Sequence, residues 1–292
     1  MTVKNALTCL ACASFGLSFA SVGIPQTAGA NTQAGTVSLK SSFAVASIRP
    51  SKPGGQLTFG TTQDGYQARS TPLVWIILAA EFDLPAAYWR PNRVLGAPGW
   101  VGSDGFDINA KLDDNAVSTF TSSSDAKRES LVKPLLGSML AERCNLVAHT
   151  EMRDSKAIGI EVNATRVKIK KSGPDSFGHQ GVSFGEGAVM RPVHDGKRMY
   201  MEFWNTSMRE LAEVMSGLGS ETQPVFVDMT NLTGKYDFIV YKREEDEPLS
   251  QATNDPDPAT LWNIGALGLT LKTVKVPLPV VIVDHIEHPS PN

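Results

Sequence analysis

Two side chains capable of acid–base chemistry lie two positions apart in one predicted strand. The stretch CNLVAHTEM is bounded and patterned like a β-strand. His149 and Glu151 within it are expected on one face, because successive side chains of a strand alternate between faces. Such a pair can bind a metal ion or act as general acid and base. It can also be a hydrogen-bonded pair that stabilises the sheet, and we favour this structural interpretation.

Other catalytic chemistries lack their usual patterns in this chain. There is no H-E-x-x-H zinc motif and no phosphate-binding glycine loop. Cys144 is the only cysteine after residue 30, and we expect a buried, inert thiol. We therefore assign no catalytic residue beyond the weak candidates His149 and Glu151, and we expect neither a cofactor nor a metal site.

Three tryptophans are candidates for contact with a ligand or partner. Trp89 and Trp100 flank a predicted turn, and Trp204 precedes a predicted helix. Large rigid rings near loops often anchor a bound molecule. They can equally belong to the core, and for Trp100 we favour the core.

One local pattern occurs twice, in WVGSDGFDINAKL and in NLTGKYDFIVYK. In each, a glycine-containing turn, with Gly105 or Gly234, leads to an aromatic residue and then to Asp107 or Asp237. Glycine accepts a positive φ at low cost. Aspartate is a poor strand former, so its recurrence suggests a side-chain bond to nearby turn amides. We expect these four residues to have a structural role.

The recurrence extends to whole elements and indicates a diverged internal duplication. Each half is predicted to contain a helix, a strand pair, a second helix and a second strand pair, with an extra strand in front. The fold class is then α+β, with two related lobes, each an antiparallel sheet with two helices on one face. The first lobe is expected at 43–170, a glycine- and serine-rich linker at 171–196 and the second lobe at 197–289.

The remaining expected elements are less regular. The Ser/Thr/Asp-rich stretch 113–125 is predicted as a loop, followed by a helix from Ser130 with Pro134 in its first turn. A helix is predicted around Leu261, Ile264 and Leu267. CNLVAHTEM and AIGIEV are predicted as two separate strands.

The N-terminus is typical of an exported protein. Residues 1–30 combine a single charge, an apolar run and a final Ala-Gly-Ala, which predicts a cleaved signal peptide, and residues 31–42 form a polar lead. Loss of Lys4 changes the net charge from −3 to about −4. We therefore expect a periplasmic or secreted protein without a later membrane span, and no nucleic-acid partner.

Several stretches together resemble a large family of secreted proteins of unknown function, expanded in soil bacteria. The matching stretches are FAVASIRPSKPGG, GAPGWVGSDGFDINAK, LLGSMLAERCNLVAHTEMRD, VDMTNLTGKYDF and VVIVDHIEHPSPN. Some relatives carry this region attached to a membrane metallopeptidase sensor domain, which implies a sensing or binding role. The family supplies no established catalytic residues.

Two functions follow as expectations. The first is a non-enzymatic binding or sensing module for an envelope or extracellular protein, peptide or glycan. The second is a hydrolase acting on an envelope or extracellular polymer, with His149 and Glu151 as its catalytic pair. The lack of a coherent nucleophile, metal set or cofactor loop favours the first.

Overall fold

The structure is a computed structural model that describes residues 42–82, 85–163, 167–218, 223–242 and 262–290. The predicted signal peptide and all of the polar lead except residue 42 lie outside the described residues. Within the described ranges, no helix has the length and apolar character that crossing a bilayer requires. The fold is α+β, as the sequence predicted, with helices packed on largely antiparallel sheets.

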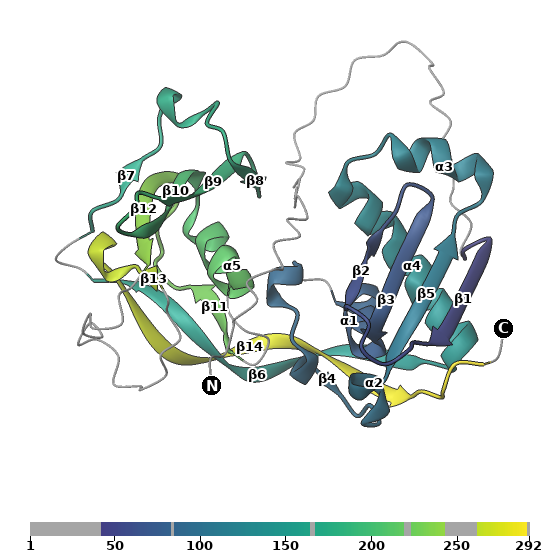
Figure 1. Ribbon diagram of the computed structural model, residues 1–292. Helices are drawn as coiled ribbons and strands as arrows, with labels where there is room; N and C mark the ends of the chain where they lie inside the picture. Colours follow the sequence, from purple (N-terminus) through teal and green to yellow (C-terminus); the bar gives the residue numbers. More distant parts are fainter. Residues whose placement is uncertain (1–41, 83–84, 164–166, 219–222, 243–261, 291–292) are drawn as a thin grey trace, which may run out of the picture.

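The first sheet has the strand order β1-β5-β3-β2, with every pair antiparallel. Its inner face is apolar: Ala68 and Ile108 are fully buried and belong to one core with helices α1 and α4. Its other face carries polar side chains such as Arg49, Arg69 and Asn109. No helix of the described residues covers that face in Figure 1. The elements of this first lobe are β1 (Val45–Pro50), β2 (Thr58–Thr61), β3 (Gly65–Pro72), α1 (Leu73–Glu81), α2 (Trp100–Ser103), β5 (Gly105–Lys111), α3 (Asp114–Thr121) and α4 (Asp125–Cys144).

The second sheet has the order β13-β12-β10-β9-β8, and β7 also pairs with β12. Phe203 and Phe238 stack between its central strands and form a second core with Met208 and Leu211 of helix α5. The elements of this second lobe are β7 (Lys170–Lys171), η3 (Pro174–Ser176), β8 (Val182–Phe184), β9 (Ala188–His194), β10 (Met199–Thr206), α5 (Met208–Leu218), β12 (Tyr236–Lys242), β13 (Trp262–Asn263) and η4 (Gly265–Leu267).

A third sheet joins the two lobes. Its centre is a long antiparallel ribbon of β6 (Val147–Val162) and β14 (Leu269–His285), which runs beneath both lobes in Figure 1. Strand β4 (Val94–Leu95) lies parallel to β14, and β11 (Val225–Asp228) lies parallel to β6. The short strand of each lobe thus pairs with the long strand that follows the other lobe. The two strands predicted from CNLVAHTEM and AIGIEV are in fact the single strand β6.

The predicted linker at 171–196 is wrong. This segment contains β8 and β9, and β9 pairs along its length with β10. Strands β8 and β9 are joined by a three-residue turn in which Gly185 and Gly187 have φ of 51° and 73°. These glycines give the segment the composition of a linker, although here they close a tight hairpin.

Several predicted helix boundaries also need correction. The stretch predicted as a loop contains α3, capped by Asp113, whose side chain accepts a hydrogen bond from the Asn115 amide at 3.2 Å. Helix α4 begins at Asp125, with Ser124 as its cap, so Pro134 lies in its interior. Both caps are residue types that serve helix starts as well as loops.

The helix predicted around Ile264 is wrong as well. Only the single 3₁₀ turn η4 forms there, and it ends at Gly268 with φ of 79°. The expectation of two helices on each sheet therefore fails for the second lobe, where the described residues contain α5 alone.

Two buried arginines, Arg90 and Arg93, lie at the junction of the lobes and belong to no motif of the sequence. Arg90 donates from Nε to the Gln223 carbonyl at 3.0 Å and from Nη2 to the Ser216 carbonyl at 2.8 Å. It thereby connects the 3₁₀ turns η1 (Ala86–Tyr88) and η2 (Pro91–Arg93) to the C-terminal end of α5, where the helix dipole favours a cation. Burial, and then the charge of Arg90, lowers the pKa of Arg93 to about 10.

Replacement of Arg90 should weaken this junction. Arg90→Met fills similar space but removes the donor to the carbonyl of buried Ser216 and to that of half-buried Gln223. We expect the free energy of unfolding, measured by urea denaturation, to fall by about 2–3 kcal/mol. Arg49→Met, at an exposed arginine, should change it by less than about 0.5 kcal/mol. An equal effect of the two substitutions would contradict this role for Arg90.

Candidate functional site

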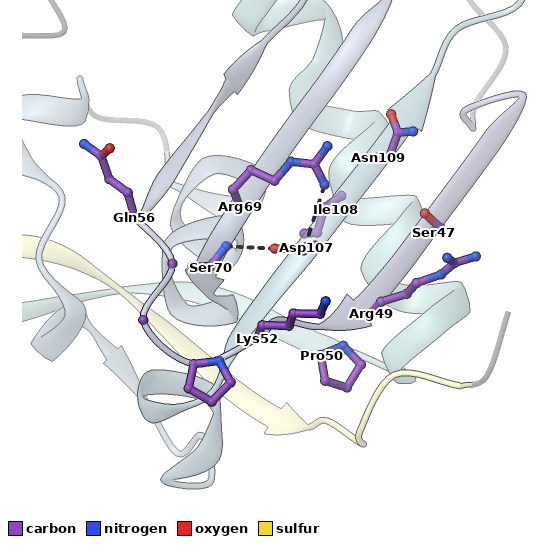
Figure 2. Close-up of a pocket in the computed structure, with 13 residues that line it drawn as sticks. Ser47, Arg49, Pro50, Lys52, Gln56, Arg69, Ser70, Asp107, Ile108 and Asn109 are labelled. Atoms are coloured by element: carbon purple, nitrogen blue, oxygen red, sulfur yellow. Dashed lines mark hydrogen bonds and ion pairs between the residues drawn. The ribbon is translucent and has the colours of Figure 1, made fainter.

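An open hollow lies on the solvent-facing side of the first sheet, beside the loop between β1 and β2 (Figure 2). We call it the sheet-face hollow. Its volume is about 780 Å³. The residues that line it are Ser47, Arg49, Pro50, Lys52, Pro53, Gly54, Gly55, Gln56, Arg69, Ser70, Asp107, Ile108 and Asn109. Most of them end in polar groups, so the hollow suits a ligand that forms hydrogen bonds.

The hollow has an excess of positive charge. Arg49, Lys52 and Arg69 line it, against the single carboxylate of Asp107. Arg69 lies 3.9 Å from Asp107, whereas Arg49 and Lys52 have no ion-pair partner among the described residues. Two unpaired cations on one rim should favour an anionic group on a ligand.

The carboxylate of Asp107 in β5 bonds to β3 and to the residue that follows β1, and we call these contacts the aspartate clamp. Its Oδ1 accepts hydrogen bonds from the Ser51 hydroxyl at 2.6 Å and from the Ser70 amide at 2.9 Å. Ser70 has φ of 44° and lies where the pairing of β3 with β5 shifts register. These two donors, the hydroxyl first, lower the pKa of Asp107, so the hollow contains a stable anion.

Asp237 makes the corresponding contacts in the second lobe. Its Oδ1 accepts from the Ser172 hydroxyl at 2.7 Å and from the Asn205 amide at 3.0 Å, and Asn205 has φ of 50°. Its Oδ2 accepts from the Ser176 hydroxyl at 2.5 Å. Burial alone would raise the pKa of Asp237, but these hydrogen bonds outweigh burial and lower it. Each aspartate thus bonds an amide of a neighbouring strand, where the sequence suggested an amide of its own turn.

The two glycines of the repeated pattern have different roles. Gly234 has φ of 114°, as expected for the turn. Gly105 has no positive φ, because α2 replaces the turn predicted before it. A Cβ at position 105 would lie 3.3 Å from the backbone carbonyl carbon of Ser70, so glycine there permits close contact between strands.

The three candidate tryptophans lie away from the described lining of the hollow. Trp100 is partly buried against the first core and stacks on His288 at 4.0 Å between ring centres. Trp89 stacks on Phe59 at 6.3 Å. Trp204 lies between His179, stacked at 4.0 Å, and the guanidinium of Arg191, 5.0 Å from its ring centre.

His149 and Glu151 do share a face, and the ribbon adds a third group. His149 Nδ1 lies 2.8 Å from Asp284, and its Nε2 lies 3.2 Å from Glu151. Arg153 pairs in turn with Glu151 at 2.9 Å. The bond to Asp284, then that to Glu151, raises the pKa of His149 and favours the protonated ring.

This arrangement gives His149 the role of a cation in a surface ion-pair network. Both ring nitrogens have carboxylate partners, so neither is free to accept a proton from a substrate. About half of the imidazole surface is exposed, and it is not part of the sheet-face hollow. Within the described residues, no group of three or more His, Cys, Asp or Glu side chains is placed to hold a metal ion.

The clamp can be tested through Asp237. Asp237→Ala removes the acceptor of three donors, and we expect the free energy of unfolding at pH 7 to fall by about 2 kcal/mol. Since the pKa of Asp237 is lowered in the folded protein, its stabilisation is present above the unfolded pKa of about 4 and is lost as pH falls through the folded pKa. The difference between wild type and variant should therefore shrink in acid. The exposed Asp154→Ala is the control; a pH-independent difference for Asp237→Ala would contradict the clamp.

The surface network predicts the opposite pH dependence for His149. Because its folded pKa is raised, its stabilisation is present below about pH 6.5 and is lost as pH rises through the folded pKa. Unfolding curves of wild type and His149→Gln should therefore converge in alkaline solution. Titration of the imidazole by NMR should give a pKa above that of an unpaired histidine, and a lowered value would rule out the network.

Comparison with known proteins places the chain in a family. No curated protein and no solved structure matches it. A family model described as a protein of unknown function (DUF3738) matches residues 78–286, which is more than half of the chain. The chain therefore belongs to the DUF3738 family of proteins of unknown function.

Proposed function

We propose that this protein is an exported, non-enzymatic binding or sensing module whose ligand site is the sheet-face hollow. The observation that carries the proposal is the hollow itself. It combines a volume of about 780 Å³ with two unpaired cations and a fixed carboxylate acceptor. These are groups that orient a polar ligand by charge and hydrogen bonding.

The chemistry of the lining supports binding over catalysis. Its titratable groups are three cations and the carboxylate of Asp107, whose Oδ1 is already engaged by Ser51 and Ser70. The serines there bond to no histidine. A nucleophile paired with a base, which hydrolysis of an amide or glycoside generally requires, is therefore lacking in the described lining.

The proposal includes the export and the internal duplication expected from the sequence. Support for duplication comes from the matching contacts of Asp107 and Asp237, and from the matching order of strands around them. In the second lobe the chain itself covers the polar face beside the aspartate, whereas in the first lobe this face is open. The protein then has one such face free for a ligand.

Binding can be tested with defined ligands. Residues 31–292, fluorescently labelled, would be applied to arrays of acidic, neutral and basic peptides and of charged and neutral glycans. We expect selective retention on acidic members, and an at least tenfold weaker affinity for Arg49→Glu/Lys52→Glu, because two attractive charges become repulsive.

The control changes the same charge elsewhere. Lys127→Glu/Lys197→Glu alters two exposed lysines outside the hollow and should leave array binding unchanged. Equal loss of binding for both double variants would show a nonspecific charge effect. Release of cleaved products from any peptide or glycan, abolished by His149→Ala, would instead support the hydrolase.

A further inference from the structure

The second lobe shows how the fold can fill the counterpart of the sheet-face hollow. The Ser51 amide donates to the Gly105 carbonyl, and the Ser172 amide donates to the Lys235 carbonyl, both at 2.9 Å. Each carbonyl residue lies two positions before the clamp aspartate. The segment that follows Ser172 therefore corresponds to the loop that follows Ser51, and SKPGG aligns with SGPDS.

The clearest difference between the two sites is at one carboxylate oxygen. In the second lobe, the Ser176 hydroxyl donates to Asp237 Oδ2. In the first lobe, Gly55 takes the position of Ser176 in the alignment and has no hydroxyl to offer. Among the described residues, the only charged partner of Asp107 Oδ2 is Arg69, at 3.9 Å. The first lobe therefore lacks the donor that the second lobe supplies from its own chain.

The planar side chain near each aspartate also differs between the lobes. The chain covers it in the second lobe and leaves it exposed in the first. Trp204 immediately precedes Asn205, just as Arg69 immediately precedes Ser70. The ring of His179 stacks on Trp204, with an interplanar angle of 7°. The loop of the first lobe turns into β2 before reaching this point, so the planar guanidinium of Arg69 lines the hollow (Figure 2).

We infer that the sheet-face hollow binds an acidic peptide segment that contains a serine or threonine, in the manner in which residues 172–179 cover the second lobe. The ligand hydroxyl donates to Asp107 Oδ2, a planar side chain or peptide group lies against Arg69, and a carboxylate lies between Arg49 and Lys52. In SGPDSFGH, the acidic Asp175 directly precedes Ser176. The inference rests on the proposed function and narrows the ligand to a class.

The chain's own segment provides the probe. The capped peptide SGPDSFGH would be titrated into the protein by calorimetry, together with the same peptide carrying Ser176→Ala and the one carrying Asp175→Asn. We expect binding of the first peptide and a roughly tenfold loss for each substituted peptide, because each loses one charge-assisted interaction. Arg49→Glu/Lys52→Glu in the protein should abolish binding, which assigns it to the first lobe.

A double-mutant cycle isolates the serine contact. Asp107→Asn keeps an oxygen for Ser51 and Ser70 but replaces the second acceptor with a donor, and thermal unfolding would verify its fold. Asp107→Asn should weaken the affinity for the serine peptide roughly tenfold and leave the affinity for the Ser176→Ala peptide unchanged. Equal loss for both peptides would overturn the hydroxyl contact.

The remaining outcomes separate this inference from the proposed function. Binding of an oligosaccharide rich in uronic acids, sensitive to Arg49→Glu/Lys52→Glu, with no binding of any serine-containing acidic peptide, would overturn the peptide inference and leave a binding module. Insensitivity of all binding to that double variant would overturn both.

Discussion

Most of the architecture depends on the register between β6 and β14. The ribbon begins within one lobe and ends within the other, so its two ends contribute to different cores. Val281 and Val283 of β14 belong to the first core, whereas Ile158 and Ile160 of β6 belong to the second. Neither core is complete without a strand that follows the other lobe. The ribbon therefore connects the two cores, although each lobe has its own sheet.

The same register creates contacts that no local pattern contains. Ile282 lies opposite His149, and the irregularity that follows brings Asp284 onto the imidazole. From the sequence, His149 and Glu151 could be placed on one face of a strand, but Asp284 is 135 residues away in the chain. A possible catalytic pair thus becomes, once the third group is included, an exposed ion-pair network.

Local periodicity was sufficient to predict the α+β class and most strands. It failed where one residue type serves two purposes. Asp113 and Ser124 belong to a loop-like composition but cap helices, and the glycines after Phe184 close a hairpin. The aspartates of the repeated pattern were predicted to bond amides of their own turns, but they bond amides of neighbouring strands. Their partners, the amides of Ser70 and Asn205, are set by strand order, which the pattern does not encode.

The ribbon also contains an exposed stretch in which β14 pairs only with β6 among the described residues. Pro277 and Pro279 lie there, opposite Asp154 and Met152. A proline inside a paired strand must direct its nitrogen away from the partner, so both point to the outer edge. That edge lacks two of the donors a foreign strand would need to attach. The two prolines therefore make this stretch of β14 a poor template for pairing with a foreign strand.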